Sequence, residues 1–466
     1  MERKNPVRIN NKYIAVIVTA VCLIIAAVIF SNAFDSQGEH AFYYSKKLNA
    51  AVVFSDENLQ KNIIPGKSIS GIRSNNSGLY SAVLMSEGSS YSLYSVSGSV
   101  VKQIDADCSN SFVTSFGAEK TMYLTTAGNL YTDAGKMIDE NVKDFAVSPG
   151  GKIVLYTKNQ DDTEKLYMYS EETSVFVADN FFPLGVSDDG RYLYVLGADN
   201  SLCILNPDGS MMSRLCSDVN KGKFWFSDDM KNIVFSDSQY TYISQQGRSR
   251  NRLVIGCAVP VLSDETEYVA NSYGNAYICK DADMYELFYS VLNDDGNYAV
   301  YYIKNDTEKT CVSENIKTFT VTGNRSVAYI DSSGRLYRFH NDKNEQLTSG
   351  VKEIVATKDN RYIYYTNSAN ELFVIKGKKT QQLSENAEKI YVTSNNKLLF
   401  ITGNKELYRV SGKMSAKLID TDVNSCKCRN NAVFYSKNFS SETGTFDLYC
   451  SKNGNRFRFA TDELTK

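Results

Sequence analysis

Few residues of the sequence have the chemistry that nucleophilic catalysis requires. A Ser, Cys or Thr nucleophile needs a positioned base, and the 466 residues include only two histidines, His40 and His340. Neither accompanies a nucleophile-elbow motif, so both are interpreted as surface residues. The tripeptide "GKS" at Gly66 lacks the upstream glycine of a phosphate-binding loop, because Lys61 stands in its place. The sequence therefore indicates neither a catalytic triad nor nucleotide binding.

Two acidic segments, "DADCSN" (105–110) and "DADMYE" (281–286), place side-chain oxygens at alternating positions, as calcium-binding loops do. The oxygen-bearing residues are Asp105, Asp107 and Ser109 in the first segment, and Asp281, Asp283 and Glu286 in the second. Both segments lack the glycine that such a loop has at its sixth position. Each is therefore predicted to be a solvated turn without a metal ion.

Two pairs of adjacent carboxylates, Asp188-Asp189 and Asp228-Asp229, are of the residue type that glycosidases use as acids. Both pairs stand in a hairpin turn that recurs along the chain, and other copies of the turn lack them. Turn geometry explains them better than catalysis does. The sequence thus predicts no catalytic residue, no cofactor-binding residue and no metal ligand, and the protein is not expected to be an enzyme.

The ten cysteines form no C-x-x-C pair, which disfavours a zinc site. Disulfides remain open for Cys203 with Cys216, and among Cys426, Cys428 and Cys450, which belong to one repeat unit each. Their spacing is irregular from unit to unit, which favours buried thiols that pack as small hydrophobes.

Composition indicates a folded, strand-rich chain. There are 51 basic and 53 acidic residues, and this balance argues against a general nucleic-acid binder. The 32 Tyr and 23 Phe favour strands. A length of 466 residues exceeds that of one ordinary core and indicates two domains or a repeat array.

The N-terminus carries a targeting signal. Tyr13–Phe30 contains no charge over 18 residues, enough for a helix to cross the lipid bilayer. Basic residues precede this run, and acidic residues follow it. The positive-inside rule therefore predicts a cytoplasmic tail over 1–12, a transmembrane helix over 13–31 and an extracytoplasmic remainder, in a single-pass protein of the cell membrane. The rival interpretation is a signal peptide cleaved after the small residues "SNA" (31–33).

A repeat fills the rest of the chain. A Leu-Tyr-like pair recurs, mostly at intervals of 35 to 41 residues. Its copies begin at Leu93, Leu130, Leu166, Leu202, Tyr240, Ala276, Leu336, Leu372, Leu407 and Leu448. About 18 residues before most copies, a polar turn such as that in "VSDDGRYLYV" (186–195) leads into an apolar strand. Four short antiparallel strands per unit predict an all-β fold, the β-propeller, with the Leu-Tyr strand inside each sheet.

The segments "VSPGGKIVLY" at Val147, "VSDDGRYLYV" at Val186 and "FSDDMKNIVF" at Phe226 are similar to the strand pair of bacterial TolB-like propeller repeats. The array behind one N-terminal anchor also resembles membrane-anchored bacterial propellers compared with the six-bladed propellers of low-density-lipoprotein receptors. The resemblance covers residues 71–460 and concerns the fold. The "YWTD" tetrapeptide of the receptor family is absent, so the resemblance implies no receptor-like ligand.

Counting gives about eleven four-stranded repeats, whereas closed propellers usually have four to eight. The count favours two tandem rings, a first propeller over 71–285 and a second over 286–466, behind a stalk over 32–70 that contains a possible ring-closing strand. The alternative is one large propeller over 40–466.

The expected function is a non-catalytic binding or scaffold platform for an envelope protein, peptide or glycan, with no cofactor and no nucleic-acid partner. One alternative is a propeller enzyme, a glycan lyase or hydrolase; the other is the sensor ectodomain of a signalling complex. The divergent stretches 281–315 and 436–447 are expected to carry the function, the latter as an enlarged hairpin loop.

Overall fold

The computed structural model describes residues 40–464 with short gaps. The gaps are 56–60, 76, 89, 161, 220–223, 227–228, 237–239, 246–250, 256–258, 263–274, 282–283, 294, 305–307, 323–325, 358–360, 394–396, 411–413, 430–431 and 453. All regular elements in the described part of the chain are strands, and they form nine hydrogen-bonded sheets. Neighbouring strands are antiparallel except β23 and β24, which are parallel.

The first half of the chain contributes five sheets. The first contains β1 (His40–Ser45), β2 (Ala50–Ser55) and β3 (Lys61–Pro65). The second contains β4 (Ser68–Ser74), β5 (Tyr80–Ser86), β6 (Tyr91–Ser97), β7 (Val100–Thr114), β8 (Thr121–Thr125), β9 (Leu130–Thr132) and β10 (Met137–Asp139). Three four-stranded sheets follow: β11 (Val142–Val147), β12 (Val154–Gln160), β13 (Thr163–Ser170) and β14 (Thr173–Asp179); β15 (Phe181–Val186), β16 (Leu193–Gly197), β17 (Leu202–Leu205) and β18 (Met211–Cys216); and β19 (Phe224–Phe226), β20 (Asn232–Ser236), β21 (Tyr240–Gln245) and β22 (Asn251–Ile255).

The second half contributes four sheets. An eight-stranded sheet contains β23 (Val259–Leu262), β24 (Asn275–Asp281), β25 (Met284–Leu292), β26 (Tyr298–Lys304), β27 (Glu308–Thr322), β28 (Ser326–Asp331), β29 (Leu336–His340) and β30 (Lys343–Thr348). Three four-stranded sheets complete the chain: β31 (Val351–Ala356), β32 (Ile363–Asn367), β33 (Leu372–Lys376) and β34 (Lys379–Ser384); β35 (Ala387–Val392), β36 (Leu398–Thr402), β37 (Leu407–Val410) and β38 (Ala416–Asp420); and β39 (Val423–Arg429), β40 (Ala432–Ser440), β41 (Thr445–Lys452) and β42 (Asn455–Leu464).

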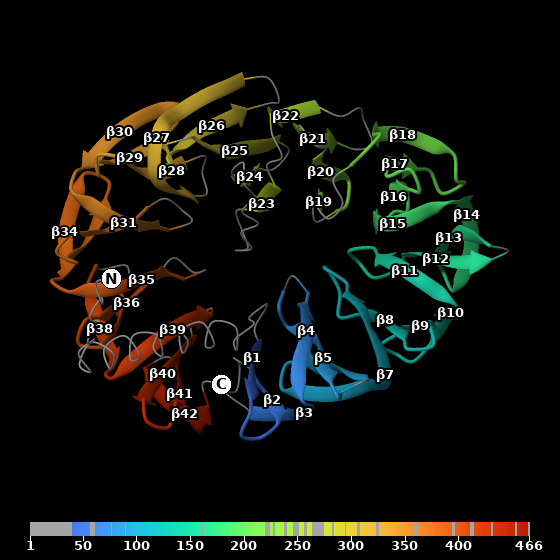
Figure 1. Cartoon of the computed structure of the whole chain (residues 1–466), viewed down its shortest axis with the longest axis horizontal. Helices are drawn as coiled ribbons and strands as arrows, with labels where there is room; N and C mark the ends of the chain where they lie inside the picture. Colours follow the sequence, from blue (N-terminus) through green and yellow to red (C-terminus); the bar gives the residue numbers. More distant parts are fainter. Residues whose placement is uncertain are drawn as a thin grey trace, which may run out of the picture.

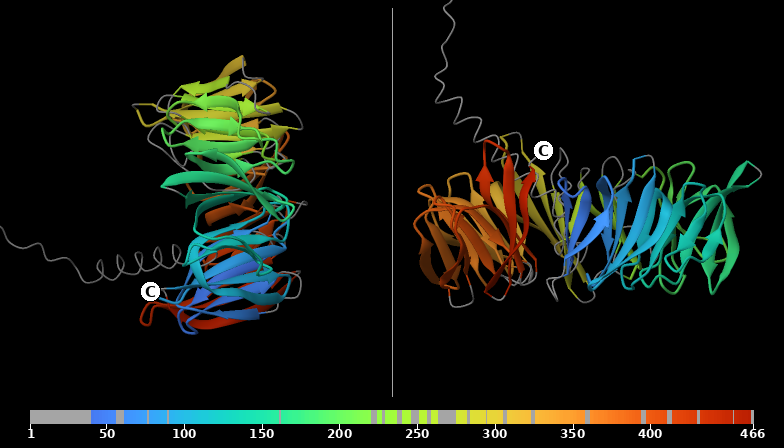
Figure 2. Two further views of the ribbon diagram at one scale, coloured as in Figure 1. Left: turned by 90° about the vertical axis from the view of Figure 1, so that its right-hand side faces the viewer. Right: turned by 90° about the horizontal axis from the view of Figure 1, so that it is seen from below.

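The sheets stand side by side around one ring, as Figure 1 shows, and the fold is an all-β propeller. Successive sheets pack face to face through separate apolar clusters, for example between β16–β17 and β20–β21. One cluster joins the two ends of the chain, because Tyr43 and Val52 of the first sheet pack against Phe434 and Leu448 of the last. Figure 2 shows these two sheets side by side from two further directions.

The structure does not divide where the sequence analysis placed a boundary between two rings. The junction between residues 285 and 286 falls inside β25, which pairs with β24 on one side and β26 on the other. Strands β24, β25 and β26 therefore form one continuous hydrogen-bonded sheet across the expected boundary. Strands β1, β2 and β3, which lie in the segment 32–70 expected to be a stalk, form a sheet of their own between the last sheet and β4–β6.

Each four-stranded sheet has its first strand nearest the ring axis and its fourth strand at the outer rim (Figure 1). The second strands are buried on both faces, as in β16, β32 and β36. The third strand is buried throughout in β17, but β29 and β37 contain both buried and half-buried residues. The outer strands are mostly exposed, as in β30 and β34. This confirms that the Leu-Tyr strand lies inside the sheet. The copy at Ala276 lies on β24, which is also inside its sheet, between the parallel β23 and the antiparallel β25.

Two long strands explain why some repeats are hard to separate. The first part of β7, up to Cys108, pairs with β6, and its last part, from Phe112 to Thr114 together with Cys108, pairs with β8. Likewise β27 pairs with β26 up to Ile316 and with β28 from there on. We call each set of four successive strands that corresponds to one sequence repeat a group. Each of these long strands is the outer strand of one group and the inner strand of the next, so two groups merge into one hydrogen-bonded sheet.

Stacked aromatic pairs recur between the second and third strands of the groups. Among the described residues there are eight, with ring centroids 4.7–5.8 Å apart and planes 10–26° from parallel. The pairs are Tyr123–Tyr131, Tyr156–Tyr167, Phe235–Tyr242, Phe288–Tyr302, Tyr329–Tyr337, Tyr365–Phe373, Phe400–Tyr408 and Tyr435–Tyr449, each directly opposed in register. The Tyr of the sequence repeat thus supplies one ring of most pairs, and the preceding Leu is fully buried, as at Leu166 and Leu407.

The polar turn before the second strand adopts the backbone that its sequence predicts. Gly190 has φ of +69° and Gly151 has +65°, values that glycine adopts without strain. In the third copy the equivalent residue is Met230, with φ of +55°. The hairpin therefore tolerates the loss of its glycine, which explains why the motif varies along the chain.

We expect the stacked pairs to be a main source of stability. Phe400 is 1% exposed and stacks on Tyr408 at 5.0 Å, so Phe400→Ala should lower the free energy of unfolding by about 3–5 kcal/mol. Phe116→Ala is the control, because Phe116 is 39% exposed; it should change the free energy by less than about 0.5 kcal/mol. Urea unfolding measures both, and equal losses would contradict this assignment.

Candidate functional site

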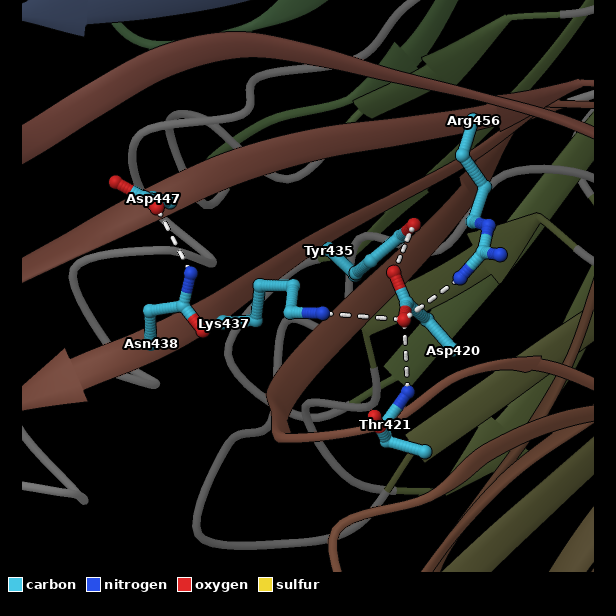
Figure 3. Close-up of polar contacts among 7 residues, drawn as sticks. All are labelled: Asp420, Thr421, Tyr435, Lys437, Asn438, Asp447 and Arg456. Atoms are coloured by element: carbon cyan, nitrogen blue, oxygen red, sulfur yellow. Dashed lines mark hydrogen bonds and ion pairs between the residues drawn. The ribbon is translucent and has the colours of Figure 1, made fainter.

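A buried carboxylate with four donors lies at the junction of the last two sheets (Figure 3). The Asp420 side chain is 5% exposed. Its Oδ2 accepts a hydrogen bond from the Tyr435 hydroxyl at 2.8 Å. Its Oδ1 accepts from Lys437 Nζ at 3.1 Å, Arg456 Nη1 at 3.0 Å and the Thr421 amide at 2.9 Å. One acid therefore holds two cations from two strands of the next sheet.

The local sequence explains this position. Asp420 ends the outer strand β38, and two residues later Asp422 takes φ of +58°, so that the chain turns at once into β39. Asp420 consequently points at the neighbouring sheet, where Tyr435 and Lys437 share one face of β40. The Lys437 ammonium also lies 5.3 Å from the centre of the Tyr449 ring, so the charge is held between an acid and an aromatic face.

The electrostatics of this cluster favour the ionised acid. Burial acts to raise the pKa of Asp420, but the hydrogen bonds from Tyr435, the Thr421 amide and Lys437 outweigh it, so the pKa lies below its ordinary value. Burial, followed by the hydrogen bond to Asp420, raises the pKa of the Tyr435 hydroxyl far above its ordinary value. Tyr435 is thus a donor that stays protonated, which suits a structural role and not a general base.

The same arrangement occurs where β10 leads into β11. Asp139 Oδ2 accepts from Tyr156 Oη at 2.7 Å and from Lys158 Nζ at 2.7 Å. Lys158 lies 5.0 Å from the centre of the Tyr167 ring. Burial opposes ionisation here too, but Lys158 and Tyr156 hold the pKa of Asp139 below its ordinary value. We call these two clusters the Asp420 clamp and the Asp139 clamp.

Sequence reasoning missed both clamps, although a signal is present. "MIDENV" (137–142) and "LIDTDV" (418–423) share an Ile-Asp pair and the Val that opens the next sheet. The Tyr-x-Lys segments "YTK" (156–158) and "YSK" (435–437) follow them. The combination marks an acid at the end of one sheet and its partners on the next.

The acids that the sequence analysis considered as ligands or catalysts accept hydrogen bonds from other groups of the fold. Asp105 accepts from the Tyr123 hydroxyl at 2.9 Å, and Asp107 from the Thr126 hydroxyl at 2.6 Å. Asp188 accepts from the Gly150 amide of the neighbouring sheet's turn at 2.6 Å, and Asp189 and Asp229 accept from amides in their own turns. The described residues contain no cluster of three His, Cys, Asp or Glu side chains suited to a metal.

The predictions for the segment 281–286 and for the pair Asp228-Asp229 concern residues that the structure describes only in part. Asp228 and Asp283 lie outside the described residues, and the side chains of Asp281 and Glu286 also lie outside them. Gly66 is described, in the turn between β3 and β4, with φ of +143°.

The two histidines are structural, and one prediction about them is wrong. His40 is 1% exposed rather than on the surface; its ring contacts the Ser81 hydroxyl at 3.2 Å and the Gly98 carbonyl at 2.9 Å. It became buried because β1 belongs to the ring and not to a stalk. His340 is half-buried at the end of β29, with Nδ1 2.5 Å from the Ser326 hydroxyl.

Six cysteines have side chains that the structure describes, and five of these are buried: Cys108, Cys203, Cys216, Cys426 and Cys450. Cys311, on β27, is exposed. Burial is the largest influence on Cys108, and together with the nearby Asp105 it raises the pKa of this thiol to about 12. The thiol therefore stays protonated near neutral pH.

The hairpin over 436–447 is not an enlarged loop. Strand β40 ends at Ser440 and strand β41 begins at Thr445, so only residues 441–444 form the turn. Phe439 packs against the apolar cluster that joins the two ends of the chain, so shortening this hairpin would disturb the ring closure. The pattern was misread because Ser, Asn and Gly are usual in loops.

A hollow of about 300 Å³ lies beside this closure, which we call the seam hollow. Its lining comprises Lys47 and Leu48 from the β1–β2 turn, Lys61 from β3, and Arg458, Ala460, Thr461 and Glu463 from β42. Two contacts cross the seam here: Ser45 Oγ donates to both Glu463 oxygens at 2.9 and 3.1 Å, and Lys47 Nζ donates to the Thr461 carbonyl at 3.3 Å.

Comparison with known proteins gives no family for the chain. No family model matches it, and no curated protein matches it. Among solved structures it is similar to the Dos1 propeller, at 12% identity over 70% of this chain and 95% of that one, with a TM-score of 0.31. It is also similar to Porphyromonas gingivalis dipeptidyl peptidase 4, at 12% identity over 72% of this chain and 63% of that one, with a TM-score of 0.41. A third similar structure is PorZ of the same organism's type-IX secretion system, at 10% identity over 92% of this chain and 66% of that one, with a TM-score of 0.32. None of these likenesses carries an argument about this chain.

The part of the chain that the structure describes contains no helix long and apolar enough to cross a bilayer. The transmembrane segment predicted over 13–31 lies outside that part.

The Asp420 clamp should contribute more to the free energy of unfolding than the Asp139 clamp, because Asp139 is 21% exposed and holds one cation instead of two. We expect Asp420→Asn to lower the free energy of unfolding by about 3 kcal/mol, since two cations lose their buried partner. Asp139→Asn should cost about 1 kcal/mol. Asp422→Asn removes a nearby exposed carboxylate while keeping a residue that accepts positive φ, and it should be neutral within about 0.5 kcal/mol.

The loss in Asp420→Asn should also depend on pH. The pKa of Asp420 is lowered in the folded protein, so its contribution is complete above the unfolded value of about 4 and disappears as the pH falls through the lowered value. The difference in unfolding free energy between the native protein and the variant should therefore be constant from about pH 5 to 8 and shrink below about pH 4. A difference that grows on acidification would rule out this clamp.

Proposed function

We propose that the chain is a membrane-tethered extracytoplasmic β-propeller of eleven repeats that acts as a non-catalytic binding or scaffold platform for an envelope glycan or protein. The observation that carries the proposal is the use of the described acids: Asp105, Asp188, Asp189, Asp139 and Asp420 hold turns or join sheets. Residues engaged in this way support a rigid frame and not turnover of a substrate.

The outer rim supports a binding role. Exposed apolar side chains lie on the outer strands of three neighbouring groups, namely Met137 on β10, Val175 and Phe176 on β14, and Met211 and Met212 on β18. Their exposed fractions range from 38% to 53%. Exposed apolar side chains on the outer strands are available for contact with another molecule.

The tether rests on the uncharged run Tyr13–Phe30 and the basic residues before it. With this topology, the exposed Cys311 thiol should react on intact cells with a maleimide that cannot cross membranes, and Cys311→Ser should remove that part of the label. In the Cys311→Ser background, Asn5→Cys should add label only after lysis. Label at residue 5 on intact cells, or at Cys311 only after lysis, would refute the orientation.

Binding without turnover is the second consequence. The full-length protein in detergent should sediment with isolated envelope material from its own cell type, and that material should release no new reducing ends or peptides. Heat-unfolded protein serves as the control for binding that requires the folded ring. Release of sugar or peptide at a measurable rate would instead establish the propeller-enzyme alternative, and absence of sedimentation would end the platform proposal.

A further inference from the structure

The first sheet lacks the strand that completes the other sheets. It contains three described strands, β1 to β3, whereas the others contain four to eight. In a group of four strands the third is paired along both edges: β13 pairs with β12 and β14, and β33 with β32 and β34. Among the described strands, β3 pairs with β2 alone, and it lies at the outer rim (Figure 1). A strand in this position presents a backbone edge to which another strand can be added.

The two faces of β3 differ. Ile64 is fully buried in the cluster shared with β4–β6, and Asn62 Nδ2 donates to the Ser99 carbonyl at 2.8 Å, in the turn between β6 and β7. Ile63 stands opposite Val52, and directly opposed residues share one face of a sheet. Ile63 is therefore on the face that Val52 turns to the last sheet, yet it is 53% exposed. The last sheet covers β2 and leaves this side of β3 open.

The facing surface of the last sheet is apolar and partly exposed as well. Phe457 on β42 stands opposite Cys450, which belongs to the cluster that joins the two sheets. Phe457 is thus on the face turned to the first sheet, where it is 39% exposed. The seam hollow lies between β42 and the first sheet, with Leu48, 45% exposed, and Ala460 in its lining. A volume of about 300 Å³ is at the lower end for small-molecule sites, so it admits the side chains of one strand and not a folded domain.

The four-stranded sheets show what fits at such a place. Their fourth strand pairs with the third and directs an apolar side chain into a joint between sheets. Val177 of β14, 5% exposed, does so beside β16 and β17, and Leu215 of β18, 1% exposed, beside β20 and β21. A strand from another protein can supply the same features. The β3 strand of a second copy is less suited, because it ends in Pro65, whose nitrogen has no hydrogen to donate.

We propose that β3 binds an extended segment of an envelope protein as the fourth strand of the first sheet. The inference rests on the platform function proposed above and names the partner as a protein rather than a glycan. Backbone hydrogen bonds along β3 supply the affinity, and apolar residues at alternate positions of the segment cover Ile63 and contact the apolar lining of the seam hollow. The intervening side chains lie on the side of Asn62 and Ser99, which suits polar residues.

The first test measures the strand pairing itself. The probe is a fluorescent peptide with the sequence of β14, Thr173–Asp179, which is a fourth strand of this chain. Its anisotropy should rise with the full chain in nanodiscs of phosphatidylcholine and not with empty nanodiscs. Two further peptides are methylated on the amide nitrogens of the even-numbered or of the odd-numbered residues from 174 to 179. One should lose binding and the other keep it, because the amides of alternate residues point to opposite edges of a strand.

Variants locate the site. Ile63→Lys places a charge where the added side chain should pack, so it should weaken peptide binding by about tenfold. Its melting temperature should stay close to that of the native protein, because Ile63 is more than half exposed. The matched control is Val175→Lys, the same kind of change at a 51% exposed position on β14, which should leave the affinity unchanged.

Four results would overturn the inference. They are no binding of the unmodified peptide to the native protein, equal binding of the two methylated peptides, equal losses in the two variants, and a native dimer that Ile63→Lys converts to monomers in light scattering. The last result would assign β3 to a second copy of the chain.

Envelope material separates a failure of this inference from a failure of the platform. Sedimentation of the protein with that material should fall in Ile63→Lys, and it should fall when the material has first been digested with a protease that is then inactivated. If sedimentation persists in either case, the platform stands on another ligand and β3 is not its site. If the native protein binds the peptide with the expected pattern but does not sediment, the strand site stands and the platform fails.

Discussion

The ring depends on the packing of each sheet between two others. A sheet whose middle strands are apolar on both faces, such as β15–β18, cannot be stable alone in water. The leucine of the repeat is fully buried in this packing, and the aromatic pairs keep the second and third strands in one register. Because every face needs a partner, the first sheet is as necessary as the others: it covers the last sheet with Tyr43 and Val52 and β4–β6 with Phe42 and Val53.

Polar contacts act where packing alone is weakest, at the rim and at the joints. The fourth strands are mostly exposed and contribute little apolar area. At two joints an aspartate at the end of such a strand reaches the next sheet through Tyr-x-Lys. At the seam, a contact of the same kind joins the first and last sheets, with Glu463 as the acid and the Ser45 hydroxyl as its donor. A carboxylate buried with its donors fixes the relative position of two sheets more narrowly than apolar packing does.

The sequence was a good guide to strands and a poor guide to what joins them. The period of the Leu-Tyr pair identified the inner strands and hence the fold, because burial on both faces leaves a continuous apolar pattern. The boundary at 285 and the role of His40 were wrong, because both depend on the partners of a strand, which a local pattern does not contain. The same limit hid the seam hollow, whose residues come together from both ends of the described chain, whereas the Asp420 clamp left a local signal that was overlooked.

The contact between Ser45 and Glu463 joins residues 418 positions apart. During synthesis the first sheet leaves the ribosome long before the last one exists, so its face with Tyr43 and Val52 has no lasting partner for most of that time. The entropy lost in bringing the chain ends together is compensated only when the final hairpin docks. The order of translation therefore makes the seam the last junction to form. In a finished molecule it is the natural place for the ring to open, which links the affinity of anything bound there to the lifetime of the closed state.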